Sequence, residues 1–270
     1  MAASYAVAAR QRLARPARRR AIGGGRRFVL SLADQVLLTI GWLRQYPTFA
    51  VLGDLFGLDD RPAARTVARL LPLLEAAGRD TRRLPDPGPH HRRDLPQLPK
   101  NTPGLLVLGD TFEQRVQRPG DPEGQPAWYS GKKKAHTVKS QVGVEEATGR
   151  IVDGADSVPG PAAALTLFKG AGLRERLPPG TGLMGDSAYQ GLDKLHLEGY
   201  SPRKKPKGPP RPEADRSYTR ESARRRIKAE HSIGRLCRFA ALTARDRQHR
   251  AGHTRRVCAV VGLVNRQLAR

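Results

Sequence analysis

The hydrophobic pattern of this chain changes its period partway along. Between residues 31 and 78, apolar side chains recur every three or four positions, as in amphipathic helices. Beyond residue 103, short apolar runs and alternating segments are typical of strands. Residues 79–103 between them are rich in proline and charge. The sequence therefore predicts an all-α unit, a linker and a mixed α/β unit.

Three helices are expected in the first unit. The first spans about 32–45, with Ser31 as N-cap, and the second covers about 48–56, with Thr48 as N-cap. Gly57 ends the second helix, and the third begins near Asp60. Helix, glycine-containing turn and helix form the outline of a helix-turn-helix, although a small helical bundle with solvated arginines fits the same pattern.

In the helix-turn-helix interpretation, the third helix enters the major groove of DNA. Arg61, Arg65 and Arg69 follow one another at four-residue spacing, which predicts one exposed stripe along that helix. These three arginines are therefore candidate DNA-binding residues.

The second unit alternates strand and helix patterns. Apolar runs at 104–110 and 181–186 each end in Gly-Asp, as buried strands do, and 135–146 and 149–157 alternate as strands. A helix is expected over 161–173. Two more helices are expected near the C-terminus, over residues 220–239 and 255–270. This mixture predicts an α/β fold.

The charge of the chain points to a polyanionic partner. Lys and Arg number 49 against 25 acids, a formal net charge of +24. Nucleic acid is favoured over a membrane because no apolar run is long enough to span a bilayer. The two cysteines form no C-x-x-C pair, and a cytoplasmic, nucleoid-associated location is the simplest expectation.

Two aspartates and one glutamate are candidate metal ligands. Asp110 and Asp186 are expected at the carboxyl ends of buried strands, where α/β proteins build their sites. Helical phase places Glu230 on the side of Ile227 and Ile233, and so pointing inward. A buried carboxylate needs a partner.

Two partners for Glu230 are open. It can form a salt bridge with Arg226 on the same face of its helix, or it can bind a cation together with Asp110 and Asp186. Hard divalent ions such as Mg²⁺ take oxygen ligands, and three carboxylates can hold two such ions for phosphodiester chemistry.

Five segments then resemble, in order, the motif blocks of DDE transposases of bacterial insertion sequences, in the group related to Harbinger-type transposases. They read "LGDTFEQRVQRP", "WYSGKKKAHTVKSQV", "DSVPGP", "GDSAYQG" and "RRRIKAEHSIGRL". The segment "LADQVLLTIGWLRQYPT" resembles the helix-turn-helix of the same group, and the resemblance covers roughly residues 30–268.

This resemblance implies an RNase H-like catalytic core that uses two Mg²⁺ or Mn²⁺ ions. It implies cleavage and strand transfer at terminal inverted repeats, with double-stranded DNA as partner and a homo-oligomer assembled on it. By position in the motifs, the catalytic and metal-binding residues are Asp110, Asp186 and Glu230.

Lysines and arginines near these acids are candidate phosphate contacts. The resemblance places the lysine run "SGKKKAHTVK" beside the first aspartate, although a solvated hairpin fits it too. Trp128 and Tyr129 next to it either stack on a frayed base or pack in the core. The candidates outside the helix-turn-helix are Lys132, Lys133, Lys134, Lys139, Arg224, Lys228 and Arg235.

Two other functions remain open: a metal-dependent DNA endonuclease without strand transfer, and an inactive DNA-binding remnant of a transposase. The N-terminal segment reads as a flexible basic arm or a disordered tail. The predicted organisation is a basic arm, a helix-turn-helix domain, a linker and an RNase H-like catalytic domain, at residues 1–30, 31–78, 79–103 and 104–270.

Overall fold

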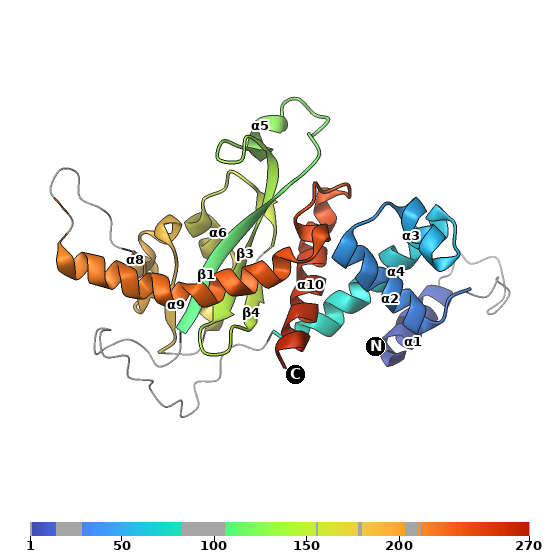
Figure 1. The fold of residues 1–270 in the computed structure, drawn as a ribbon, viewed down its shortest axis with the longest axis horizontal. Helices are drawn as coiled ribbons and strands as arrows, with labels where there is room; N and C mark the ends of the chain where they lie inside the picture. Colours follow the sequence, from blue (N-terminus) through green and yellow to red (C-terminus); the bar gives the residue numbers. More distant parts are fainter. Residues whose placement is uncertain are drawn as a thin grey trace.

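The computed structural model shows a sheet-containing body joined side by side to a cluster of helices. In Figure 1 the helix α10 (His253–Leu268) stands between the sheet and the helical cluster. The described residues are 2–14, 29–82, 106–154, 156–177, 180–202, 210 and 212–269. Most of the predicted linker lies outside them.

The helical cluster matches the three helices expected from the sequence. They are α2 (Leu32–Gln45), α3 (Phe49–Phe56) and α4 (Asp60–Arg79). Ser31 caps α2 by accepting a hydrogen bond from the Asp34 amide at 3.2 Å, and Thr48 caps α3 in the same way. Gly57 ends α3 with a φ of 63°, a left-handed conformation that glycine adopts without strain.

The N-terminal segment differs from the expected flexible arm. Residues 2–13 form a helix, α1 (Ala2–Leu13), while residues 15–28 lie outside the described part of the chain. Alanines make up much of α1, and alanine has the highest helix propensity of all residues.

The second unit is built on a mixed sheet, as the sequence predicted. The strand order is β2-β3-β1-β6-β7, and β4 and β5 also pair with β3. β1 runs antiparallel to β3 and parallel to β6, which is in turn parallel to β7. The strands are β1 (Leu106–Arg115), β2 (Tyr129–Ser130), β3 (Ala135–Glu145), β4 (Ile151–Gly154), β5 (Val158–Pro159), β6 (Gly182–Met184) and β7 (Gly199–Tyr200).

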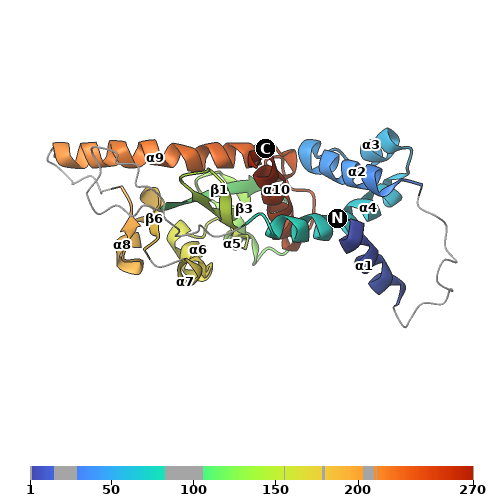
Figure 2. The same ribbon diagram turned by 90° about the horizontal axis from the view of Figure 1, so that it is seen from below.

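Helices cover both faces of this sheet. The long helix α9 (Glu213–Cys237) crosses one face, and α6 and α7 lie on the other (Figure 2). The single helix expected over 161–173 is divided in two, because Gly172 adopts a left-handed φ of 61° just before α7. The remaining short helices are α5 (Gln125–Trp128), α6 (Ala164–Gly170), α7 (Leu173–Arg176) and α8 (Leu192–Leu195), with 3₁₀ turns at Ser187–Tyr189, Ala240–Leu242 and Arg250–Gly252.

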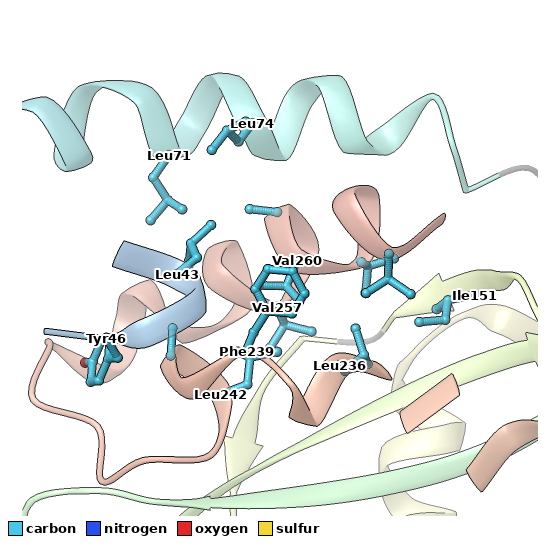
Figure 3. Packing of buried hydrophobic residues seen from close by; sticks show 14 of the residues in the cluster. Leu43, Tyr46, Leu71, Leu74, Ile151, Leu236, Phe239, Leu242, Val257 and Val260 are labelled. Atoms are coloured by element: carbon cyan, nitrogen blue, oxygen red, sulfur yellow. The ribbon is translucent and has the colours of Figure 1, made fainter. Parts of the chain in front are cut away.

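One hydrophobic core runs through both units. Figure 3 shows Leu71 and Leu74 of α4 facing Val257 and Val260 of α10, with residues of α2 and α9 alongside. The helices α4 and α10 approach so closely that a Cβ added at Gly262 would lie 2.3 Å from the backbone of α4. The helix-turn-helix is therefore held against the sheet unit by shared packing, while the boundaries of the domains remain a prediction.

Candidate active site

The site is built on two neighbouring parallel strands with matched sequences. The last pair in the β1–β6 register is Leu108 with Met184, and each of these residues is followed by Gly-Asp. Neighbouring strands lie about 4.8 Å apart. Asp110 and Asp186 therefore occupy equivalent positions along adjacent strands.

One of the two expected strand ends is wrong. Asp186 follows β6, as predicted, but Asp110 lies in the middle of β1, which continues to Arg115. The strand continues because it pairs with β3 beyond this point, with Asp110 opposite Val142. Only the parallel pairing stops, so Asp110 still stands just past the parallel part of the sheet.

Tyr189 packs beneath both aspartates. A Cβ added at Gly109 would lie 3.5 Å from the Tyr189 ring, and one added at Gly185 would lie 2.4 Å from it. The glycine before each aspartate therefore leaves space for this ring, and a larger residue at 185 would displace it. The motif "GDSAYQG" contains both the aspartate and the tyrosine, but the sequence analysis did not single out Tyr189.

Asp110 is a half-buried carboxylate whose charge is only partly neutralised. Its side chain is 16% exposed, and its Oδ1 accepts a hydrogen bond from the Thr111 amide at 2.7 Å. Burial raises its pKa, the Thr111 amide and Arg226 lower it, and the negative charges of Asp186 and Glu230 raise it further. All three predicted acids thus act electrostatically on one place.

Glu230 lies beside this centre but not on the buried face that the helical phase predicted. The buried residues of α9 are Ser222, Ala229, Ser232 and Leu236. Glu230 is exposed, and its supposed apolar neighbour Ile227 is 43% exposed. On this side of α9 the helix lies close to the sheet unit, since Ser232 donates a 2.7 Å hydrogen bond to the Gly149 carbonyl. Such a close approach favours small side chains there.

The alternative partner considered for Glu230, a salt bridge with Arg226, is not found among the described residues either. Arg226 Nη2 lies 4.0 Å from Asp110 Oδ2 instead. In the described part of the chain, no group of three His, Cys, Asp or Glu side chains is close enough to hold a metal ion. The charges of Asp186, Glu230 and Arg226 all act on Asp110, but the three acids do not form a closed ligand set in this arrangement.

The backbone orients the second aspartate as it does the first. Asp186 Oδ1 accepts a hydrogen bond from the Ala188 amide at 2.9 Å, at the start of a 3₁₀ turn that ends at Tyr189. The same turn therefore places both the carboxylate and the tyrosine.

The arginines of the helix-turn-helix divide into two groups. Arg61 and Arg65 are exposed on α4, as predicted. Arg69 is half-buried, and its Nη2 donates to Gln35 Oε1 of α2 at 2.8 Å, so its assignment to the exposed stripe is wrong. The stripe shifts by 40° every four residues, and by Arg69 it has reached the side of α4 that packs on α2.

The lysine run lies far from the acids rather than beside Asp110. Lys132, Lys133 and Lys134 are exposed at the turn before β3. Ala135, which follows them, is seven residues along β3 from the partner of Asp110, a separation of roughly 24 Å along the strand. Figure 1 shows this hairpin projecting away from α9.

Lys139 does not belong to the exposed group. Its Nζ lies 3.4 Å from Glu113 Oε1 and donates to the Ala162 carbonyl, so its charge is already partnered. The aromatic pair is partly covered: the Arg250 guanidinium lies 4.6 Å above the Trp128 ring, whereas Tyr129 is 46% exposed.

The basic residues predicted on α9 differ in how exposed they are to a DNA phosphate. Arg224 is exposed, with Glu221 3.7 Å away, and Lys228 is exposed and donates to the Ala147 carbonyl at 3.2 Å. Arg235 is half-buried against Ser232. In the described residues, no helix is long and apolar enough to cross a membrane.

Comparison with known proteins identifies the family of the chain. Residues 109–265 match the family model of the DDE superfamily endonuclease, and residues 28–80 match that of the helix-turn-helix of DDE superfamily endonuclease. The chain is 31% identical over 247 residues to the "Probable transposase for insertion sequence element IS702" of Microchaete diplosiphon, covering 91% of this chain and 84% of that protein. No solved structure gives a significant match. The chain thus belongs to the DDE transposases of insertion sequences, with a helix-turn-helix ahead of the endonuclease unit.

Proposed function

We propose that this chain binds the terminal inverted repeats of its element and carries out metal-dependent strand cleavage and strand transfer there. Asp110, Asp186 and Glu230 are the proposed metal ligands. The observation that supports the proposal is that the charges of Asp186 and Glu230 both act on Asp110 and raise its pKa, while Arg226 neutralises it only in part.

The donor set suits a hard divalent ion. DDE endonucleases use divalent metal ions, and three carboxylates supply the oxygen ligands that Mg²⁺ or Mn²⁺ takes. The centre also has a deficit of positive charge, since Arg226 approaches Asp110 only to 4.0 Å. When bound, two such ions would activate the attacking hydroxyl and stabilise the leaving oxygen of a phosphodiester.

The residues of the chain orient the reacting groups. The amides of Thr111 and Ala188 hold Asp110 and Asp186 in fixed directions. Glu230 is exposed on α9 and completes the set by a change of side-chain rotamer. Arg226 then leaves Asp110, and we propose that it turns to a DNA phosphate, because guanidinium groups pair well with phosphates.

Duplex DNA would contact the chain at separate places. Arg61 and Arg65 are proposed to contact the end DNA from α4, and Arg224 and Lys228 to contact phosphates next to Glu230. The turn lysines reach DNA farther from the cut. An element has two ends, so we propose that a homo-oligomer works on both.

Cleavage of labelled end DNA in Mg²⁺ tests the metal ligands. We expect Asp110→Asn, Asp186→Asn and Glu230→Gln to lower the cleavage rate at least about 100-fold and to leave DNA binding unchanged, because each loses a ligand but none of the positive charge. Asp193→Asn, an exposed acid on α8, is the matched control. Wild-type cleavage by Glu230→Gln would remove Glu230 from the site.

A supplied 3′-hydroxyl end and a target plasmid separate the remaining functions. Joined products mean transposase, cleavage without joining means endonuclease, and binding without cleavage means an inactive remnant.

The DNA contact of the helix-turn-helix is tested by comparing exposed arginines at the two ends of α4. Arg65→Ala should weaken end-DNA binding by about 10-fold, in line with loss of about 1–3 kcal/mol for a base or phosphate contact. Arg79→Ala, an exposed arginine at the far end of α4, is the matched control. Equal affinities of the two variants for end DNA would mean that the N-terminal part of α4 does not contact it.

A further inference from the structure

A group of exposed arginines lies where the end of α2 meets the end of α9. Between residues 231 and 270 the sequence contains one acid, Asp246, and the buried Arg256 takes up its charge. Exposed arginines surround this buried pair. We refer to them as the junction patch: Arg44 of α2, Arg238 directly after α9, and Arg245 and Arg247 of the segment that leads to α10.

Contacts between these segments hold the junction patch together. The Arg44 guanidinium lies 5.3 Å from the centre of the Phe239 ring, and Phe239 directly follows Arg238. Arg247 donates a hydrogen bond to the Tyr46 carbonyl at the end of α2, and its guanidinium lies 4.5 Å from the centre of the Tyr46 ring. The helix-turn-helix and α9 therefore present these arginines on adjoining surfaces.

Uncharged groups hold two arginines of the junction patch, Arg44 and Arg247. An aromatic ring or a carbonyl fixes a guanidinium without neutralising it. In the described part of the chain, no carboxylate forms an ion pair with any arginine of the patch, whereas the exposed Arg79, Arg176 and Arg255 each have one. The patch therefore keeps an excess of positive charge, which attracts phosphate groups.

The junction patch begins a short distance from Glu230. Arg238 follows Glu230 by eight residues, which is about 12 Å along α9 at about 1.5 Å per residue. The two side chains differ in direction by about 80°, and both are exposed. Nothing lies within 4 Å of a Cβ added at Gly234, midway between them, so a DNA backbone can follow this side of α9 closely. At about 3.4 Å per base pair, the separation corresponds to about three to four base pairs.

We propose that the junction patch binds phosphates of the end DNA about three to four base pairs from the cut, on the side toward the helix-turn-helix. This inference rests on the proposed function, in which one duplex reaches both Glu230 and α4. The patch adjoins both α2 and α9, and so it lies on the path between those two places. Contacts between guanidinium groups and phosphates fix the register of a protein on DNA without reading its bases. The junction patch thereby sets the spacing between the recognised sequence and the cut.

Binding of end DNA at stepped KCl concentrations tests the junction patch. The junction variant, Arg238→Gln with Arg245→Gln, removes two exposed charges. For a fluorescent end duplex in EDTA, we expect the slope of log K against log [KCl] to fall by about 2, about one unit for each phosphate contact, and the affinity to fall about 10-fold. Lys169→Gln with Arg79→Gln removes the same charge from α6 and the far end of α4, and this matched control should keep the slope. Equal slopes for the two variants would overturn the proposal.

End duplexes with uncharged methylphosphonate linkages locate the contact. With these linkages about three to four base pairs from the cut on the element side, the unmodified protein should lose as much affinity as the junction variant loses on ordinary DNA. The junction variant should lose little more, because its contact is already gone. The same linkages on the flanking side of the cut should affect both proteins alike. Additive losses on the element side would place the contact elsewhere and reject the proposal.

Arg238→Lys with Arg245→Lys separates the loss of charge from damage to the fold. Lysine keeps the positive charge, so this variant should recover the salt slope of the unmodified protein. Thermal unfolding midpoints of all variants show whether each one is folded. A lysine variant that unfolds normally but keeps the reduced slope would mean that charge at these positions does not bind phosphate.

Cleavage assays separate this inference from the proposed function. If the junction variant matches the control in salt slope while Glu230→Gln abolishes cleavage, the catalytic site stands and the junction patch is rejected. If the junction variant loses the contact while Glu230→Gln cleaves at the normal rate, the patch stands and the assignment of Glu230 is wrong.

Discussion

Asp246 and Asp110 are both withdrawn from water, yet their surroundings differ. Asp246 is 1% exposed and fully partnered. Its Oδ1 accepts hydrogen bonds from the Tyr46 hydroxyl and the Gln248 amide, each at 2.9 Å, and its Oδ2 accepts one from Arg256. Asp246 thereby ties the end of α2 to the start of α10.

Asp110 carries the same negative charge, but fewer hydrogen-bond donors and a more distant guanidinium neutralise it. Arg226 lies 4.0 Å away, two other acids face it, and its pKa is raised. The comparison teaches that a buried acid with both oxygens partnered joins parts of the fold, whereas Asp110, left short of positive charge, fits the cation ligand proposed for it. Under the proposed function, stability and catalysis thus depend on different carboxylates.

The largest effect is expected when the buried ion pair between Asp246 and Arg256 is removed. Asp246→Ala leaves the Arg256 guanidinium, 2% exposed, without its counter-ion and should lower the free energy of unfolding by about 3–5 kcal/mol. Urea unfolding followed by circular dichroism measures this loss. Asp193→Ala, which removes an exposed acid, is the control. A loss no larger than the control's would mean that Asp246 does not hold the two units together.

A smaller effect is expected where the same two units meet through glycine. A Cβ at position 262 would lie 2.3 Å from Gly78 Cα, so Gly262→Ala forces α4 and α10 apart and should destabilise by about 1–3 kcal/mol in the same assay. Gly41→Ala is the matched control: nothing lies within 4 Å of its added Cβ, and alanine raises helix propensity. If Gly262→Ala and Gly41→Ala changed the free energy of unfolding in the same direction, the close contact of α4 and α10 would not explain the effect.

The smallest effect is a pH dependence at Asp110. Because its pKa is raised in the folded state, the folded protein binds this proton more tightly than the unfolded chain, and ionisation above the ordinary aspartate range lowers stability. Asparagine cannot ionise. Asp110→Asn should therefore be the more stable protein at neutral pH in EDTA, with an advantage that shrinks as pH falls toward about 4.

Urea midpoints at several pH values, for both proteins, test this sign. An advantage that grows on acidification would show that Asp110 is stabilised, not destabilised, as a carboxylate.

Local signals in the sequence predicted most of the helices and one of the two aspartate positions. The caps at Ser31 and Thr48 and the break at Gly57 depend on neighbours a few residues away, and all three were confirmed. The position of Asp186 after β6 follows from a short apolar run of the same kind. Such features need no knowledge of distant contacts.

The orientation of side chains was predicted less well. Glu230 was placed inward because Ile227 and Ile233 suggested an apolar side of the helix, but α9 packs through small residues and leaves Ile227 exposed. Arg69 and Lys139 were grouped with exposed cations, but Gln35 and Glu113 engage them. Each partner comes from another element, and its position could not be inferred from spacing alone.

The sequence by itself determined the order of the elements, the residues available for chemistry and the excess of positive charge, since these depend on composition and on local hydrogen bonding. Tertiary structure alone decided which strands became neighbours, and so brought Asp110 and Asp186 to the same register and placed Tyr189 beneath them. It also decided that Arg226 faces Asp110. The physical reason is that burial and charge compensation are set by groups distant in sequence, whose approach only the packed chain defines.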